Sequence, residues 1–263
     1  MRPIELTPRL LALAQQLPEG ARFADVGTDH ARLPVWLLER GIVQHAIASD
    51  LREGPLEQAR ETARRHALTE RLSFRLGDGL APIRGEEVDV CAIAGMGGET
   101  IAAILAACPW ATSANHTFLL QPMTSVEELR SWLWRSGFRI TQEILVGEGR
   151  TIYVVITAIP GSMVPLTPAE EWAGRQYRGM ESPLRATYLD RLAGRVAHML
   201  EGLRHSTRPE DLEKLPQLDE VLTGLNQMKE EWDRWQRERM YSSFWTALRL
   251  LTPRWILITP VFW

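Results

Sequence analysis

The chain has only two cysteines and no long apolar run, and these shortages exclude several classes of protein. Cys91 and Cys108 are too few for a disulfide framework, so we expect both thiols to be reduced and packed in the interior. The first residues lack the apolar stretch of a signal peptide. No window reaches the roughly 18 uninterrupted apolar residues of a membrane span. We therefore expect a cytoplasmic protein that does not associate with membranes.

Basic residues are not in excess either, which argues against a strongly basic nucleic-acid-binding protein. The 263 residues carry 30 basic and 33 acidic side chains, a net charge of −3, and 45% of them are hydrophobic, as in a folded globular chain. Residues 175–208 depart from this balance, because they hold seven arginines and only three acidic residues. Such a helix face can follow phosphates, but it is also typical of a solvated coiled-coil surface. Charge alone leaves both interpretations open.

Strand-like and helical patterns alternate from the beginning of the chain. Apolar runs predict strands over residues 22–26, 44–49, 72–76, 88–94 and 116–121. Helical spacing between and after them predicts helices over residues 31–40, 53–67, 98–107 and 125–135. Two further strands, 138–146 and 151–159, flank a four-residue link and indicate a hairpin. This order predicts an α/β fold, a Rossmann-like doubly wound parallel sheet that ends in an antiparallel pair.

The chain beyond residue 160 is expected to be helical. Prolines and a glycine interrupt regular structure and mark a boundary, so we divide the chain into residues 1–160, 161–240 and 241–263. Thr167 begins a capping box, and a helix is expected from there to about Leu203, followed by a second over 210–240 with a break at Pro216. The two helices predict an antiparallel coiled-coil hairpin. The Trp-rich tail 241–263 includes a strand-like run at 255–259, and its role is not assigned.

The loop after the first predicted strand, Ala24 to His30, contains one glycine between two carboxylates. Gly27 allows the tight turn that brings a ligand close to the end of the strand and the next helix. A dinucleotide-binding loop would be Gly-x-Gly-x-x-Gly, and Asp25 and Asp29 would repel a pyrophosphate. The same carboxylates suit the sulfonium and ammonium groups of S-adenosylmethionine, so the sign of the charge favours this methyl donor over NAD. The alternative is a plain strand-to-helix turn in which Asp29 caps the helix.

Three later loops strengthen this interpretation because they follow successive strands, at the edge where open parallel sheets bind ligands. Asp50 ends the second strand, where an acidic residue accepts hydrogen bonds from ribose hydroxyls. Asp78 lies between two glycines after the third strand, within reach of an adenine amino group. After the fourth strand, the turn Ala94-Gly-Met-Gly-Gly98 replaces the Asp/Asn-Pro-Pro-aromatic motif of many amino-group methyltransferases. This turn offers exposed backbone for close approach of a ligand, and Met96 as an apolar wall against a flat base. The alternative is a glycine turn that only caps the following helix.

The segments GTDHARLP, SDLREGPLEQA, GDGLAPI, IAGMGGETI and LLQP occur in this order and spacing. Together they resemble the bacterial tRNA (adenine-22 N1)-methyltransferase family over about residues 5–240. The resemblance implies a class I Rossmann-like methyltransferase domain in residues 1–160 and a tRNA-binding helical extension in 161–240. It departs from the family at Met123, where members usually have Asn, and in the Trp-rich tail.

The resemblance also implies which residues bind and act. Contacts to S-adenosylmethionine are implied for Asp25, Gly27, Asp29, His30, Asp50, Asp78, Gly79, Ala94, Gly95 and Gly97. The implied reaction is transfer of the donor's methyl group to N1 of an adenine in tRNA. Asp29 is the first candidate to stabilise the positive charge that the adenine gains, His30 the second, and Met96 a third residue at the reacting atoms. His30 also fits a loop histidine with no such role.

The remaining expectations concern partners and rival functions. Arg191 and Arg195 are the candidates for phosphate contacts with tRNA. No metal is expected, and the oligomeric state is left open, with a monomer among the alternatives. The first three loops fit an S-adenosylmethionine enzyme with a different substrate equally well. A non-catalytic cofactor-binding module that uses its helices and tail for a partner is the other alternative.

Overall fold

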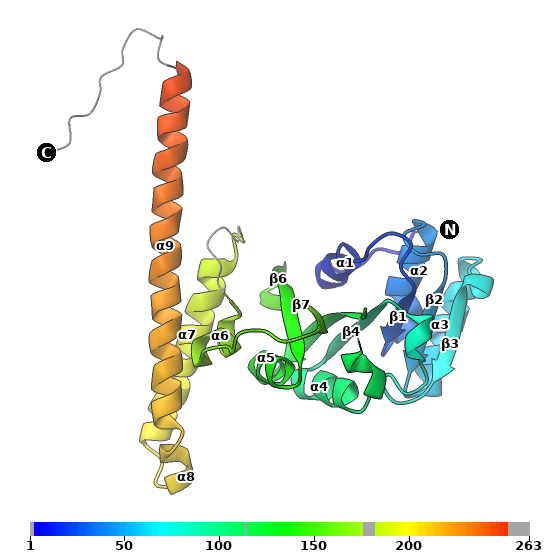
Figure 1. Ribbon diagram of the computed structural model, residues 1–263, viewed down its shortest axis with the longest axis horizontal. Coiled ribbons are helices and arrows are strands. Elements are labelled where there is room, and N and C mark those ends of the chain that lie inside the picture. The colour runs from blue at the N-terminus through cyan, green and yellow to red at the C-terminus, as the bar shows by residue number, and fades with distance from the viewer. Residues whose placement is uncertain (1–2, 114, 176–181, 252–263) are drawn as a thin grey trace, which may run out of the picture.

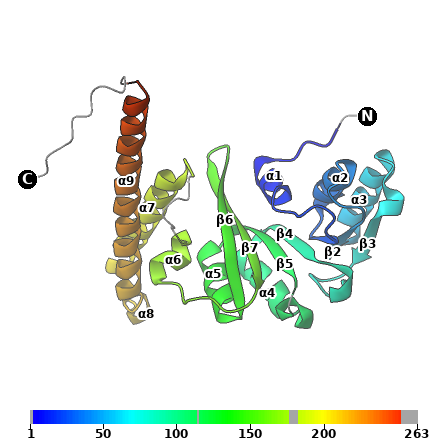
Figure 2. The same ribbon diagram turned by 45° about the horizontal axis from the view of Figure 1, so that its top comes forward.

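A computed structural model describes residues 3–113, 115–175 and 182–251 of the chain. They form a seven-stranded sheet with helices on both faces, and a helical projection beyond one edge of the sheet (Figures 1 and 2). No helix in these three ranges is long and apolar enough to cross a lipid bilayer.

The sheet has the order β3-β2-β1-β4-β5-β7-β6. Its strands are β1 Phe23–Val26, β2 Ala46–Asp50, β3 Leu72–Leu76, β4 Val90–Gly97, β5 Thr117–Thr124, β6 Phe138–Glu148 and β7 Thr151–Pro160. The first five strands are parallel, and β7 pairs antiparallel with both β5 and β6. The predicted doubly wound sheet and its closing hairpin are confirmed. β4 runs three residues further than expected, through the glycine-rich turn, with register shifts at Met96.

Alternate residues of each strand face two separate cores, because side chains point to opposite faces of a sheet. One core receives α1 Pro8–Ala14, α2 Arg32–Glu39 and α3 Glu53–Arg65, and the other receives α4 Gly98–Ala106 and α5 Val126–Arg135. Short 3-10 turns lie at Asp29–Ala31, Thr69–Arg71, Gly85–Glu87 and Pro109–Thr112. The sequence patterns predicted each of these α-helices except α1, which packs against β5, β6 and β7.

The helical region differs from the prediction in two places. The expected helix from Thr167 to Leu203 is wrong as a single element: α6 Pro168–Ala173 stops at Gly174, whose φ is +73°, and α7 Arg185–Arg204 is a separate helix. The capping box is confirmed, since Thr167 Oγ1 accepts a hydrogen bond from the Glu170 backbone N at 3.2 Å. After α8 Pro209–Leu212, helix α9 Leu215–Leu251 continues past residue 240. The helix therefore has no break at the expected start of the tail, and the strand-like run 255–259 lies outside the described residues.

The two long helices pack against each other and against the sheet domain. α7 and α9 lie side by side, with α8 in the turn that reverses the chain (Figures 1 and 2). The core on that side of the sheet continues into them through buried apolar residues such as Val196, Leu200, Val221 and Leu225. The helical hairpin is thus observed, while its supercoiling stays a prediction.

A buried arginine joins the sheet domain to α6. Arg130 on α5 is 1% exposed, and its Nε lies 2.7 Å from Glu143 Oε1 on β6. Its Nη1 donates to the backbone oxygens of Glu171 at 3.0 Å and Trp172 at 2.6 Å, at the end of α6. A buried charge is tolerated only when it is paired and hydrogen-bonded, so this contact fixes three elements in one arrangement.

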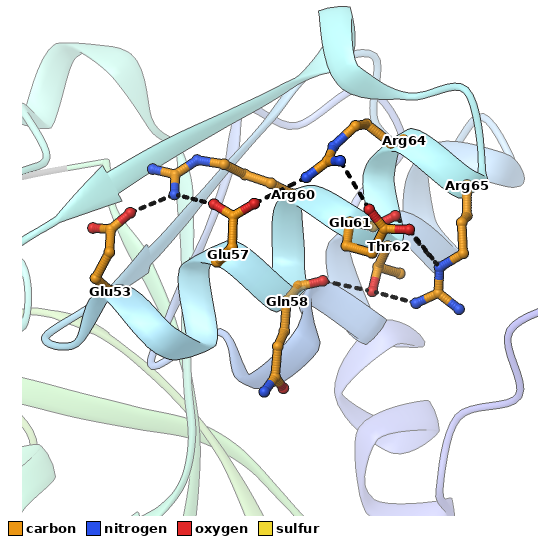
Figure 3. Close-up of polar contacts among 8 residues, drawn as sticks. All are labelled: Glu53, Glu57, Gln58, Arg60, Glu61, Thr62, Arg64 and Arg65. Carbon is orange, nitrogen blue, oxygen red and sulfur yellow. Dashed lines mark hydrogen bonds and ion pairs between the residues drawn. The ribbon is translucent and has the colours of Figure 1, made fainter.

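The outer face of α3 carries interleaved acidic and basic side chains (Figure 3). Arg60 is paired with Glu53 and Glu57, and Arg64 lies 2.9 Å from both Glu57 and Glu61. These exposed pairs add little stability. They do neutralise the arginines of this helix, so α3 is not a basic surface for a polyanion.

Candidate active site

The loops after β1, β2 and β3 are joined to one another at the carboxyl edge of the sheet. The backbone N–H groups of Gly27 and Thr28 donate to the Ser49 oxygen at 2.8 and 3.0 Å, which ties the first loop to the end of β2. Gly77 N donates to the Asp50 oxygen at 3.0 Å, which ties the third loop to the same strand end. The parallel order therefore places Asp25, Asp29, Asp50 and Asp78 along one rim, as the sequence predicted.

Asp25 is the buried carboxylate of this rim. Burial raises its pKa to about 6, a hydrogen bond from Thr28 Oγ1 at 2.6 Å opposes that rise, and the nearby carboxylates of Asp50 and Asp29 add to it. Each of these carboxylates makes it harder for Asp25 to lose its proton. A cation at the rim reverses this effect, because it stabilises all three negative charges together.

We expect the burial of Asp25 to lower the stability of the protein above pH 6. Its native pKa of about 6 exceeds the unfolded value of 3.8, so the native state retains a proton that the unfolded state releases. Stability therefore falls as pH rises from about 4 to 6 and stays lower above that. Asp25→Asn should be more stable than the wild type by about 2–3 kcal/mol at pH 8, with no difference near pH 4.

Urea unfolding at pH 4, 6 and 8 without donor measures this difference. Asp78→Asn is the matched control, because it removes a water-exposed carboxylate from the same rim. An Asp25→Asn advantage that is equal at all three pH values would contradict this account of the burial.

Asp29 and His30 lie in a strained turn between β1 and α2. His30 and Ala31 adopt left-handed φ values of +55° and +52°, which are costly for residues with a Cβ. The Asp29 side chain is 81% exposed, and His30 Nε2 lies 3.2 Å from its Oδ1. No side chain caps α2, whose N-cap residue is Ala31, so the alternative in which Asp29 caps this helix is wrong. The turn instead leaves both side chains accessible to solvent at the end of β1.

Met96 covers the glycine of the first loop. Gly27 has φ +73°, and a Cβ built on it would lie 2.2 Å from Met96 Cε. Gly95, with φ +76°, lets β4 bulge here and brings Met96 back toward β1. The turn that contains Ala94, Gly95 and Gly97 thus lies next to the first loop. Gly79 occupies the third loop, and a Cβ there would meet Ile104 of α4.

Exposed apolar side chains accompany the acidic ones. Leu51 is 64% exposed directly after Asp50, Leu76 is 56% exposed just before the Gly77–Gly79 loop, and Met123 is 40% exposed at the end of β5. Large apolar side chains at the carboxyl ends of three strands suit the flat faces of heterocyclic rings. The sequence patterns did not single out the two leucines. Their positions in the chain, next to Asp50 and close to Asp78, are the signal that could have identified them.

Arg9 on α1 is a second group that the sequence did not indicate. Its Nη1 donates to Gln121 Oε1 on β5 at 3.0 Å, and its Nε lies 3.6 Å from Glu148 Oε1 on β6. These partners are more than a hundred residues away in the chain, so no local pattern connects them.

The arginines predicted to bind tRNA and the two cysteines contact other parts of the protein. Arg191 Nη1 donates to the Arg150 oxygen at the tip of the β6–β7 hairpin at 2.8 Å, and Arg195 Nη2 lies 2.6 Å from Glu127 Oε1 on α5. Both cysteines are buried and unpaired, and burial raises the pKa of the Cys91 thiol. Within the described ranges, no group of three or more His, Cys, Asp or Glu side chains is placed to hold a metal ion.

Comparison with known proteins identifies the family of this fold. Residues 6–156 match the family model of a methyltransferase domain. The chain is 34% identical over 161 residues to the tRNA (adenine(22)-N(1))-methyltransferase of Bacillus subtilis, which covers 61% of this chain and 68% of the relative. The crystal structure of the Bacillus subtilis tRNA methyltransferase TrmK has a TM-score of 0.77 and 26% identity, covering 86% of this chain and 99% of that one. A Streptococcus pneumoniae structure in complex with S-adenosyl-L-methionine has a TM-score of 0.70 and 33% identity, covering 83% and 100%.

The fold and the acidic rim therefore define a methyltransferase of the Rossmann-like class. More particularly, the chain belongs to the tRNA (adenine(22)-N(1))-methyltransferase family.

The residues of the rim fit S-adenosylmethionine. The carboxylates of Asp25, Asp29 and Asp50 lie near one another, and burial raises the pKa of Asp25. A cation would stabilise their negative charges, and the donor carries two cationic groups, a sulfonium and an ammonium. Left-handed backbone at Gly27 and Gly95 forms the tight turns at the ends of β1 and β4, and the missing Cβ at Gly27 leaves room for the Met96 side chain beside the rim. Leu51 and Leu76, exposed at the ends of β2 and β3, have the apolar character that suits the faces of the donor's base.

Proposed function

We propose that this protein transfers a methyl group from S-adenosylmethionine to N1 of an adenine in tRNA, adenine 22 by its family. The observation that carries the proposal is the row of carboxylates at the ends of β1, β2 and β3, set in a domain that matches methyltransferases from residue 6 to 156. With tRNA as the substrate, we expect the protein to act in the cytoplasm.

We assign the donor contacts to the rim loops. Asp25 and Asp29 would face the cationic groups, Asp50 the ribose hydroxyls, Asp78 and Gly79 the adenine, and residues 94–97 the side from which the acceptor approaches. When bound, S-adenosylmethionine supplies an electrophilic methyl group. The chain's own task is to hold the acceptor nitrogen in line with that group, and such positioning can account for most of the acceleration.

The charges of the site suit the change that the acceptor undergoes. N1 of adenine attacks through its own lone pair, so no general base has to remove a proton first. The ring gains positive charge in the transition state, and we assign its stabilisation to the exposed carboxylate of Asp29, which lies beside His30. The target base must leave its stack in the folded RNA to reach a site at the rim.

The helical projection is the proposed tRNA-binding part, and Arg191 on α7 is our first candidate for a phosphate contact. One of its N–H groups donates to the Arg150 oxygen, and among the described residues no carboxylate pairs with its exposed guanidinium. Arg195 is paired with Glu127 and lies 4.4 Å from the centre of the Trp172 ring, so we expect it to contribute less.

Arg191→Ala should weaken tRNA binding and flatten its dependence on salt. Loss of one phosphate contact reduces the slope of log K against log salt concentration by roughly one. Filter binding at several salt concentrations measures that slope. Arg204→Ala on the same helix, whose guanidinium is paired with Asp219, is the control. Equal slopes for Arg191→Ala and the wild type would remove Arg191 from the interface.

Incubation with labelled donor and unmodified bulk tRNA, followed by nucleoside analysis, tests the proposal as a whole. We expect label in 1-methyladenosine. Label in another nucleoside, or only in protein or small molecules, would favour a methyltransferase with a different substrate. Donor binding in calorimetry without transfer to any RNA would favour a non-catalytic module.

A further inference from the structure

One arginine joins α1 to three strands at the rim. Besides its contacts with Gln121 and Glu148, Arg9 donates its backbone N–H to Glu148 Oε2 at 3.4 Å. Its guanidinium carbon lies 5.7 Å from the centre of the Tyr153 ring on β7. Because these partners come from β5, β6 and β7, Arg9 fixes the first turn of α1 to the far half of the sheet edge.

The same guanidinium holds the side chain of Met123. Gln121 is fully buried, and its Nε2 donates to the Pro122 oxygen at 2.9 Å. Arg9 Nη1 and Gln121 Nε2 each lie 3.6 Å from Met123 Sδ, so the thioether sulfur is held between two donors. A flexible side chain that is 40% exposed is thereby kept in one position.

This group lies directly beside the proposed donor loops. A Cβ built on Gly95 would be 3.7 Å from Arg9 Nη1, so the guanidinium lies over the glycine turn. Met96 pairs with Pro122, and Gly97 pairs with Thr124, which places Met123 next to the end of β4. The donor loops lie on the other side of β4, after β1, β2 and β3. Met123 therefore occupies the side that is left for the acceptor.

We propose that Met123 is the apolar surface on which the target base lies, and that Arg9 is the positioning residue that holds it there. This inference rests on the proposed methyl transfer. A base that gains positive charge is poorly placed beside an unpaired guanidinium, and Glu148 and the Tyr153 ring compensate that charge. The arginine thus orders the acceptor side without opposing the reaction electrostatically.

The test uses the full-length enzyme and tRNA transcripts under steady-state conditions. We expect Arg9→Ala to lower kcat by about thirtyfold to a hundredfold, the cost of a misplaced acceptor, with the donor Kd within about twofold of the wild type. Met123→Ala should lower kcat by about tenfold, whereas Met123→Leu, which keeps an apolar surface, should retain most of it. Arg9→Lys keeps one donor to Gln121 and loses the planar fork, so we expect an intermediate rate.

Two further measurements separate positioning from folding. Combining Arg9→Ala with Met123→Ala should be no slower than Arg9→Ala alone, since both changes remove the same surface. A transcript with 2-aminopurine at the methylated position should show the fluorescence change of base capture with the wild type and lose it with Arg9→Ala. Arg40→Ala, which removes an exposed arginine that lies over Trp36 at the end of α2, is the control and should behave as the wild type.

The possible failures are distinguishable. If the wild type methylates no tRNA, the proposed function fails, whatever the variants do. If it methylates tRNA and Arg9→Ala lowers the melting temperature and the donor affinity together with the rate, Arg9 only anchors α1 and the inference is overturned. Equal rates for Met123→Ala, Met123→Leu and the wild type would overturn the assignment of Met123.

Discussion

Replacing Asp29 with alanine is expected to lower the rate of methyl transfer by at least about a hundredfold, the effect of losing one well-placed electrostatic group. The carboxylate lies at the rim, in a turn whose left-handed backbone at residues 30 and 31 costs energy. Because no side chain of this turn caps α2, helix capping does not explain that cost. Its side chain is 81% exposed, so its removal should leave the melting temperature within about 2 °C of the wild type.

Single-turnover kinetics with saturating donor measure the effect on the chemical step. Asp29→Asn separates charge from shape, and it should be nearly as slow as the alanine variant if the negative charge is what matters. Glu19→Ala, at the opposite end of β1, is an equally simple removal of an exposed carboxylate and should have no effect. Near-normal turnover by Asp29→Ala would exclude this residue from the site.

The second large effect is expected at Gly98, the first residue of α4. A Cβ built there would lie 2.1 Å from the Ser125 backbone oxygen and 3.1 Å from Leu129 Cβ. Backbone cannot move aside as a flexible side-chain end can, so Gly98→Ala must push the beginnings of α4 and α5 apart. We expect a loss of about 2–3 kcal/mol in unfolding free energy, as for an overpacked core. The turn 94–97 directly precedes Gly98, so donor affinity should fall as well.

Gly54→Ala provides a matched comparison for this variant. Gly54 lies in the first turn of α3, and a Cβ there would have nothing within 4 Å. Because alanine favours helix more than glycine does, this variant should be as stable as the wild type or up to about 1 kcal/mol more stable. Urea unfolding with and without donor compares the two. If both glycine variants unfold alike, the contact between Gly98 and Ser125 does not constrain the fold.

Much of the site was predictable because the order of parallel strands converts positions in the chain into positions along an edge. Asp25, Asp50 and Asp78 lie near the carboxyl ends of three consecutive strands, and those strands are neighbours in the sheet. Their convergence needs only the right-handed connections that βαβ units share. The same regularity made the hairpin of β6 and β7 predictable from a short link between two apolar runs.

The predictions of helices were wrong where the local sequence pattern does not determine the structure. The apolar spacing after Thr167 continues through Gly174, and a glycine is tolerated within a helix, so one long helix was a reasonable prediction. In the structure, a Cβ at Gly174 would lie 1.9 Å from Glu143 Oε2, so this position is decided by a strand about thirty residues earlier. The short helix α1 was missed because seven residues carry too little periodicity to be recognised.

The sequence by itself therefore determined the α/β architecture, the acidic rim and the family, since each depends on patterns that are short in the chain or repeated along it. Only the tertiary structure decided that Arg9 meets Gln121, Met123 and Glu148, and that Arg130 is buried between α5, β6 and α6. The physical reason is that a charged side chain in a helix looks like a solvent-facing one until its distant partners are known. Burial, and the hydrogen bonds that compensate it, are properties of the packed molecule.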